Sequence, residues 1–103
     1  MTTVLERNIA LPLDAIRAFC ERNHIRRLAL FGSVLREDFG LESDVDVLVE
    51  FEESAQIGYF DLARIQREFA EIVGRPVDMG TFKMISPFVR DRILTSMRVV
   101  YGK

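Results

Sequence analysis

The sequence contains one cysteine, one histidine and no tryptophan among its 103 residues. A lone cysteine, Cys20, excludes an internal disulfide and a zinc site built from several cysteines, and it is typical of a reducing compartment. No apolar run approaches the roughly 20 residues that cross a bilayer. The first ten residues also lack the pattern of a secretory signal. We therefore expect a soluble, cytoplasmic protein without a membrane segment.

A large excess of charge of either sign is also missing, because 14 basic and 16 acidic residues leave a net charge of -2. Proteins that coat nucleic acids are normally basic, so we expect no direct nucleic-acid binding. The sequence does have 49% hydrophobic residues, enough to form a core. Since no repeat or linker divides the chain, we expect one domain that spans residues 1–103.

Two hydrophobic periods alternate along the chain. Helical spacing is found in 12–24, 59–73 and 86–97, and short apolar runs predict strands in 27–31, 43–51, 76–79 and 99–101. Gly74 is suited to end the second helix, and Ser86 followed by Pro87 is a typical helix start. The expected fold class is α/β, a small mixed β-sheet with helices mainly on one face.

Two aspartates, Asp44 and Asp46, interrupt an otherwise apolar strand pattern. Side chains alternate along a strand, so the intervening valines face a core while both aspartates face outward. Neighbouring carboxylates repel each other unless a cation lies between them. Mg²⁺ takes oxygen ligands and commonly bridges carboxylates to nucleotide phosphates. Taken alone, the pair is more often part of a solvated strand face.

A Gly32-Ser33 pair stands where the first apolar strand passes into a short helical turn. Glycine lets a backbone approach a phosphate closely, and a helix start presents free N–H groups. An ordinary capped turn has the same composition, and the downstream glycine and lysine of a Walker A loop are missing. If strands 27–31 and 43–51 are neighbours, however, this turn and the acidic pair converge. Their combination favours a metal–nucleotide site.

Residues 31–36 (FGSVLR) and 43–49 (SDVDVLV) together resemble the signature of the DNA polymerase β-like nucleotidyltransferase superfamily. The short length and Arg36 make the chain most similar to the minimal nucleotidyltransferases (MNT), the antitoxins of HEPN/MNT toxin–antitoxin pairs. The similarity is close over 28–51 and looser over 75–78 and 86–94. It implies a polymerase β-like palm core. Many relatives have glycine after the arginine, whereas this chain has acidic residues that we expect to face solvent.

The resemblance implies a role for six residues. Asp44 and Asp46 would bind metal, with two Mg²⁺ ions expected, and Asp78 would complete the catalytic cluster near the attacking hydroxyl. Without the resemblance, Asp78 is an ordinary strand-edge residue. Gly32 and Ser33 would hold the β- and γ-phosphates of ATP. Arg36 either approaches a phosphate or pairs with neighbouring acidic residues.

The function implied by the resemblance is Mg²⁺-dependent transfer of AMP from ATP to a tyrosine hydroxyl of a partner HEPN toxin. Such AMPylation would neutralise the toxin. Two alternatives remain open, namely an inactive antitoxin that neutralises its partner by binding alone and a nucleotidyltransferase that acts on a small molecule. Apolar Phe82, Met84 and Phe88 leave homo-oligomerisation open as well.

Overall fold

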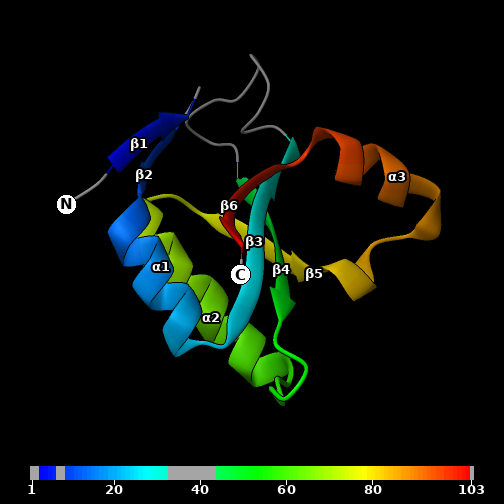
Figure 1. Ribbon diagram of the computed structural model, residues 1–103, viewed down its shortest axis with the longest axis horizontal. Coiled ribbons are helices and arrows are strands. Elements are labelled where there is room, and N and C mark those ends of the chain that lie inside the picture. Colours follow the sequence, from blue (N-terminus) through cyan, green and yellow to red (C-terminus); the bar gives the residue numbers. More distant parts are fainter. Residues whose placement is uncertain (1–2, 7–8, 33–43, 103) are drawn as a thin grey trace.

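In the computed structural model of the chain, the described residues are 3–6, 9–32 and 44–102. Figure 1 shows their arrangement, with helices α1 and α2 on one side of a central sheet and α3 on the other side of the view. The described elements are, in chain order, β1 (Thr3–Glu6), β2 (Ile9–Pro12), α1 (Leu13–Arg22), β3 (Ile25–Phe31), β4 (Val45–Phe51), α2 (Tyr59–Val73), β5 (Val77–Thr81), the 3₁₀ turn η2 (Phe82–Met84), α3 (Pro87–Ser96) and β6 (Arg98–Gly102).

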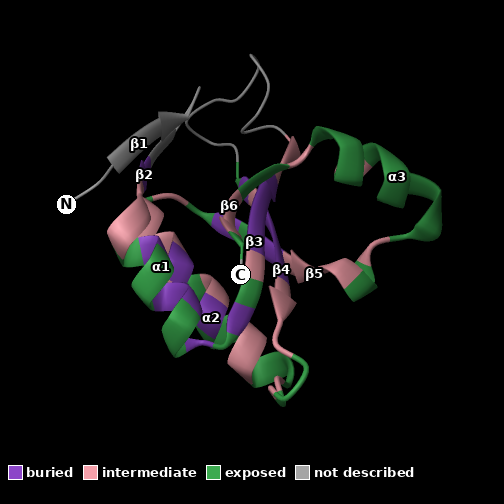
Figure 2. Ribbon diagram, viewed as in Figure 1, coloured by how far each residue is buried: buried purple, intermediate pink, exposed green. Residues whose placement is uncertain are grey.

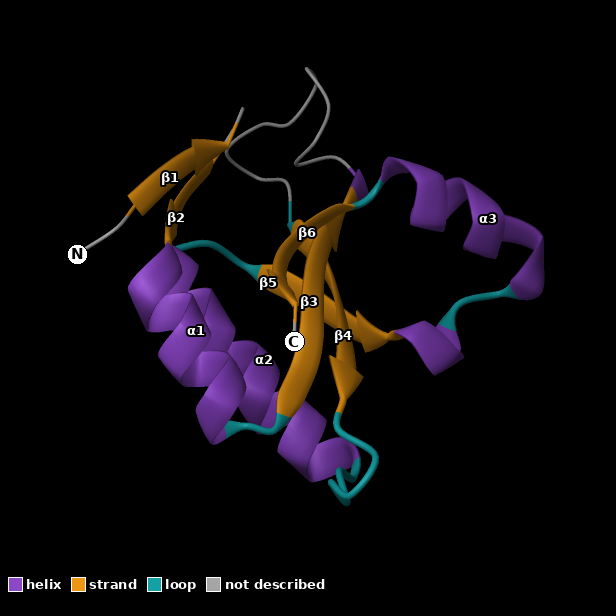
Figure 3. Ribbon diagram, viewed as in Figure 1, coloured by secondary structure: helices purple, strands orange, loops and turns teal. Residues whose placement is uncertain are grey.

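The central sheet is mixed, as predicted, and its strand order is β5-β4-β3-β6. Strand β3 is antiparallel to both β4 and β6, whereas β4 and β5 are parallel. A parallel pair needs a long crossover between its strands, and α2 provides it (Figure 3). Strands β1 and β2 form a separate antiparallel pair. Strand β5 is therefore an edge strand of the sheet.

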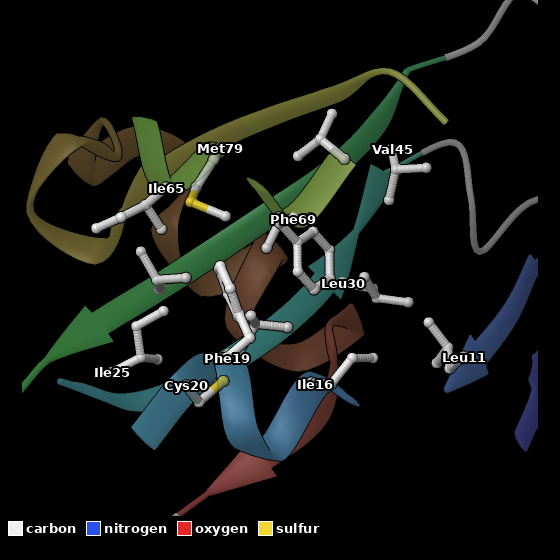
Figure 4. Close-up of a cluster of buried hydrophobic side chains, with 14 residues drawn as sticks. Leu11, Ile16, Phe19, Cys20, Ile25, Leu30, Val45, Ile65, Phe69 and Met79 are labelled. Atoms are coloured by element: carbon white, nitrogen blue, oxygen red, sulfur yellow. The ribbon is translucent and has the colours of Figure 1, made fainter. Parts of the chain in front are cut away.

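The hydrophobic core lies between one face of the sheet and helices α1 and α2 (Figure 4). The rings of Phe19 in α1 and Phe69 in α2 meet there, with centroids 5.3 Å apart. Because side chains alternate along a strand, the valines of β4 enter this core and the aspartates take the opposite face. The buried core members from the sheet are Ile25, Leu28, Leu30, Val45, Val47, Val49, Val77 and Met79.

The ends of α2 and α3 follow the predicted signals. The carboxylate of Asp61 accepts a hydrogen bond from the Gly58 N–H at 3.0 Å, which satisfies one backbone donor at the start of α2. Gly74 ends that helix in the left-handed conformation at φ 70°. At the start of α3, the Ser86 hydroxyl accepts a hydrogen bond from the Phe88 N–H at 3.3 Å.

Helix α3 differs from the other two helices because none of its residues is buried. Phe88 is 98% exposed, whereas Val89 and Leu94 are 38% and 39% exposed. Figure 2 shows this helix exposed along its length and apart from α1 and α2. The helix is thus confirmed at the predicted place, but its apolar residues are open to contacts outside this chain. No helix in the described ranges is both long and apolar enough to span a bilayer.

Two features of the fold were not predicted. Strand β3 starts at Ile25, two residues before the expected start, because Arg26 and Arg27 separate the buried Ile25 from the apolar run that follows. The β1–β2 pair was also missed, although Leu11 of β2 is fully buried in the core. Its segment has no glycine to indicate a hairpin turn.

Candidate active site

Two carboxylates occupy paired positions on the face of the sheet opposite α1 and α2. Asp46 is the second residue of β4, Asp78 is the second residue of β5, and the parallel ladder places them directly side by side. Neighbouring strands lie about 4.8 Å apart, and paired residues project from the same face. The fold therefore brings together two aspartates that are distant in the sequence.

Asp44 precedes β4 by one residue and is exposed, as is Asp78, whereas Asp46 is half-buried. The two-residue spacing puts Asp44 on the same face as Asp46. Within the described ranges, however, no three His, Cys, Asp or Glu side chains lie close enough to form a metal-binding group. The three aspartates thus share one region of the sheet without converging on a single point.

Gly32 brings the end of β3 against this region. Phe31 is the ladder partner of Asp46, so the following residue, Gly32, lies beside the Asp46 side chain. A Cβ atom on Gly32 would lie 3.2 Å from the Asp46 Cγ and 3.4 Å from its Cβ, and closer still to Oδ2. Gly32 also has φ +75°, which disfavours L side chains. A larger residue at this position would be strained and would displace the Asp46 carboxylate. The predicted proximity of the glycine turn to the acidic strand is confirmed at Gly32.

Two of the predicted phosphate-binding residues, Ser33 and Arg36, lie outside the described residues, as do the acidic residues that follow them. Their roles stay predictions. Gly32 fixes where this segment begins, next to Asp46.

The donor set at this site fits Mg²⁺ in its chemistry. Mg²⁺ is usually bound by one or two carboxylates together with substrate phosphates. Asp46 and Asp78 supply two carboxylates at neighbouring positions on one face, and Asp78 is exposed to an approaching ligand. The site is therefore suited to a metal ion that is bound by protein carboxylates and nucleotide phosphates together.

One contact at the site was not predicted from the sequence. The backbone N–H of Met79 donates a hydrogen bond to the side-chain oxygen of Gln66 in α2, at 2.8 Å. Met79 directly follows Asp78 on β5. The sequence does not predict this contact for a glutamine on an amphipathic helix, because the contact depends on how α2 crosses the edge of the sheet.

A separate cleft of about 570 Å³ lies at the other end of β4 and β5. Residues from 49–53 and 81–84 line it, where both strands end. Along β4, Asp46 is four residues from Glu50, which corresponds to roughly 13 Å. Phe82 lines the cleft, and its ring centroid lies 4.6 Å from the guanidinium carbon of Arg27. This cleft is distinct from the aspartate region.

Cys20 and His24 do not belong to the aspartate region. Cys20 is fully buried, and burial, with a smaller contribution from Glu21, raises the pKa of its thiol to about 12. The predicted core role of Cys20 is confirmed. His24 follows α1 in a left-handed conformation, and its Nδ1 lies 3.9 Å from the Glu52 carboxylate, beyond the far end of β4.

The sequence matches the nucleotidyltransferase domain family over residues 13–100. It is 38% identical over 73 residues to a protein of Methanocaldococcus jannaschii that is provisionally assigned as a protein adenylyltransferase, covering 71% of this chain and 76% of the relative. A second protein of that organism with the same provisional assignment is 32% identical over 74 residues, covering 71% and 74%.

Solved structures of similar fold include a protein described provisionally as a minimal nucleotidyltransferase, with 30% identity, a TM-score of 0.68 and coverage of 82% of this chain and 85% of that one. A toxin–antitoxin structure with AMP-PNP has 18% identity, a TM-score of 0.72 and coverage of 90% and 75%. A complex of the tri-AMPylated Shewanella oneidensis HEPN toxin with its MNT antitoxin has 17% identity, a TM-score of 0.63 and coverage of 88% and 70%. The last two show the fold alone.

The expected α/β fold is confirmed by these structures. The family match extends over most of the chain and includes Gly32, Asp46 and Asp78. The chain therefore belongs to the nucleotidyltransferase domain family, and it is an enzyme with the fold of the minimal nucleotidyltransferases.

Proposed function

We propose that this chain transfers AMP from ATP to a hydroxyl group of a partner protein and that Asp44, Asp46 and Asp78 hold Mg²⁺ for this reaction. The observation that most supports the proposal is the pairing of Asp46 with Asp78 in the ladder, with Gly32 packed against Asp46. This arrangement is found in a chain of the nucleotidyltransferase family.

Each aspartate has a distinct position from which to act. Asp46 is half-buried in β4, and Asp44 is exposed one residue before the strand. In the proposed arrangement both face the bound nucleotide. Asp78 is on the edge strand β5, where an acceptor protein can reach it. When bound, Mg²⁺ neutralises charge on the phosphates and favours ionisation of the acceptor hydroxyl.

The group transfer needs only the acceptor and ATP as reactants. The acceptor oxygen attacks the α-phosphorus, the bond from that phosphorus to the bridging oxygen breaks, and pyrophosphate leaves. Asp78, closest to the acceptor side, receives the hydroxyl proton before it passes to solvent. In the proposed site, Gly32, Ser33 and Arg36 hold the β- and γ-phosphates.

The acceptor that we propose is a tyrosine of a HEPN toxin in the cytoplasm, so that the chain acts as an antitoxin. Relatives provisionally assigned as protein adenylyltransferases support a protein acceptor. Two solved neighbours support the partner class, one in a toxin–antitoxin structure with AMP-PNP and one with an AMPylated HEPN toxin. The exposed α3 offers surface for such a partner.

Neutralisation by binding alone is the second candidate. It is favoured by one observation, namely that no residue of α3 is buried, which leaves a helix free to cover another protein. An antitoxin of this kind would use exposed apolar side chains such as Phe88 to cover its partner.

The experiment incubates the chain with ATP labelled at the α-phosphate, Mg²⁺ and the protein encoded by the adjacent gene. We expect label on the partner with the wild-type chain. Asp46→Asn and Asp78→Asn should each lower the transfer rate by about 100-fold or more, because loss of a metal ligand costs at least as much as loss of its supporting contacts. Glu71→Gln, an equal change of charge at an exposed position of α2 on the opposite side of the sheet, should leave the rate unchanged.

Three results separate the candidates. Label transfer that depends on Asp46 and Asp78 supports the proposed enzyme. A tight complex that never becomes labelled supports neutralisation by binding alone. Transfer that persists in both aspartate variants rejects the assigned site, whatever the identity of the acceptor.

A further inference from the structure

The contact between Gln66 and β5 reaches the backbone next to a proposed metal ligand. Gln66 lies in α2 between the buried core residue Ile65 and the exposed Arg67, and it is itself only partly exposed. Its Oε1 atom accepts the Met79 N–H at 2.8 Å. Because Met79 is 4% exposed and part of the core, this hydrogen bond forms in a partly buried place where geometry is well defined.

The Met79 N–H points away from the rest of the sheet. Along a strand, the backbone N–H and C=O groups of successive residues point alternately toward its two edges. The Val45 N–H of β4 donates to the Pro76 carbonyl at 2.9 Å, so the Pro76 carbonyl points toward β4. The backbone polar groups of residues 76, 78 and 80 therefore point toward β4, and the N–H of Met79 points toward the outer edge of the sheet. Edge strands normally leave such groups to water or to another strand. Here a side chain of α2 takes that place.

The position of the Asp78 carboxylate depends on this outer contact. The Met79 N–H belongs to the same planar peptide unit as the Asp78 carbonyl, because a peptide bond is rigid. The ladder with β4 holds one side of this unit and Gln66 holds the other. Two contacts on opposite sides fix the orientation of the peptide, and with it the direction in which the Asp78 side chain leaves β5.

We infer that Gln66 is a positioning residue that sets the Asp78 carboxylate beside Asp46 for metal binding. The inference rests on the proposed function in so far as Asp78 is a metal ligand. Groups that hold a ligand in place typically change metal affinity or activity by about 10- to 100-fold when they are removed. Gln66 itself touches neither metal nor nucleotide in this role.

Two variants at Gln66 and one control test the inference. Gln66→Met removes the acceptor oxygen at similar length, and Gln66→Glu keeps an acceptor. Arg67→Met introduces the same new side chain at the next, exposed position of α2. The free chain is titrated with Mn²⁺, followed by electron paramagnetic resonance, and amide hydrogen exchange is measured at Met79 and at the core residue Val47.

In Gln66→Met, we expect the Met79 amide to exchange at least about 10-fold faster and the Mn²⁺ dissociation constant to rise about 10-fold. The Val47 amide should be unaffected, which separates a local effect from general destabilisation. Gln66→Glu should bind Mn²⁺ at least as tightly as the wild type and protect Met79, because its carboxylate accepts the same hydrogen bond. Arg67→Met should match the wild type in both readouts.

Unchanged Mn²⁺ affinity in Gln66→Met overturns the inference, as does an equal loss in Arg67→Met. A wild-type chain that binds no Mn²⁺ overturns it together with the role of Asp78 as a ligand. Nucleotide transfer is measured separately. If the wild type binds Mn²⁺ in the manner expected but transfers no nucleotide, the proposed function fails and the positioning role of Gln66 stands.

Discussion

At the scale of the residue, one glycine shapes the candidate site together with its aspartates. Gly32 combines a left-handed backbone with a side-chain position that the Asp46 carboxylate occupies. Gly74 has nearly the same backbone, at φ +70°, but its side-chain position is open. The chain thus contains a matched pair of glycines that separates backbone strain from crowding at the site.

We predict that Gly32→Ala and Gly74→Ala will each lose about 1–2 kcal/mol of unfolding free energy from the left-handed conformation. Only Gly32→Ala should also displace Asp46, and we expect its transfer rate to fall by about 10-fold or more. Denaturant unfolding and the labelled-ATP assay measure the two effects. Normal transfer by folded Gly32→Ala would show that the close approach has no catalytic importance.

Residues differ in how well the sequence predicts their place. The neighbourhood of Gly32 and Asp46 was predictable, since a glycine that ends one strand and an acidic pair in the next meet when the two strands pair. The pairing of Asp78 with Asp46 was expected from the family resemblance and not from the spacing. Gln66 had no signal, because its partner is a backbone group whose direction is set by sheet order.

At the scale of the element, Asn23 joins the end of α1 to α2. It is 4% exposed, its amide donates to the Phe19 carbonyl at 3.0 Å, and its oxygen accepts from Arg64 of α2 at 3.4 Å. The shorter bond closes the last turn of α1, whereas the longer bond involves a largely exposed partner. The hydrogen bond at the end of α1 should therefore contribute more to the unfolding free energy than the contact between α1 and α2.

We predict that Asn23→Ala will lower the unfolding free energy by about 1–2 kcal/mol, since it removes a buried hydrogen bond and some packing. Arg64→Ala should change it by no more than about 0.5 kcal/mol, because exposed polar contacts of this kind contribute little. Urea unfolding of both variants tests the difference. An equal loss in the two would mean that the contact between α1 and α2 is the important one.

Helices whose ends carry typical capping residues were predicted correctly. Ser86 with Pro87 marked the start of α3, and Gly74 marked the end of α2. The β1–β2 pair had no such signal in the sequence. It is attached to the rest of the fold through Leu11, which is buried in the core. The exposure of α3 also escaped prediction, because an apolar helix pattern does not say whether the surface that it meets belongs to the same chain.

At the scale of the whole molecule, the two ends of the parallel strands offer different places for a ligand. Asp46 and Asp78 lie near the starts of β4 and β5, and the cleft beside Phe82 lies at their ends. Ligands of open α/β sheets often bind at the carboxyl ends of strands, which would favour the cleft. Under the proposed function the nucleotide binds at the opposite end, because the end of the antiparallel β3 brings Gly32 to the start of β4.

The location of the bound nucleotide tests the central claim most directly. In the assigned amide spectrum of the chain, AMP-PNP with substoichiometric Mn²⁺ should broaden the signals of Gly32, Asp46 and Asp78 more strongly than those of Thr81 and Phe82. Strongest broadening at Thr81 and Phe82 would place the nucleotide in the cleft and contradict the aspartate site.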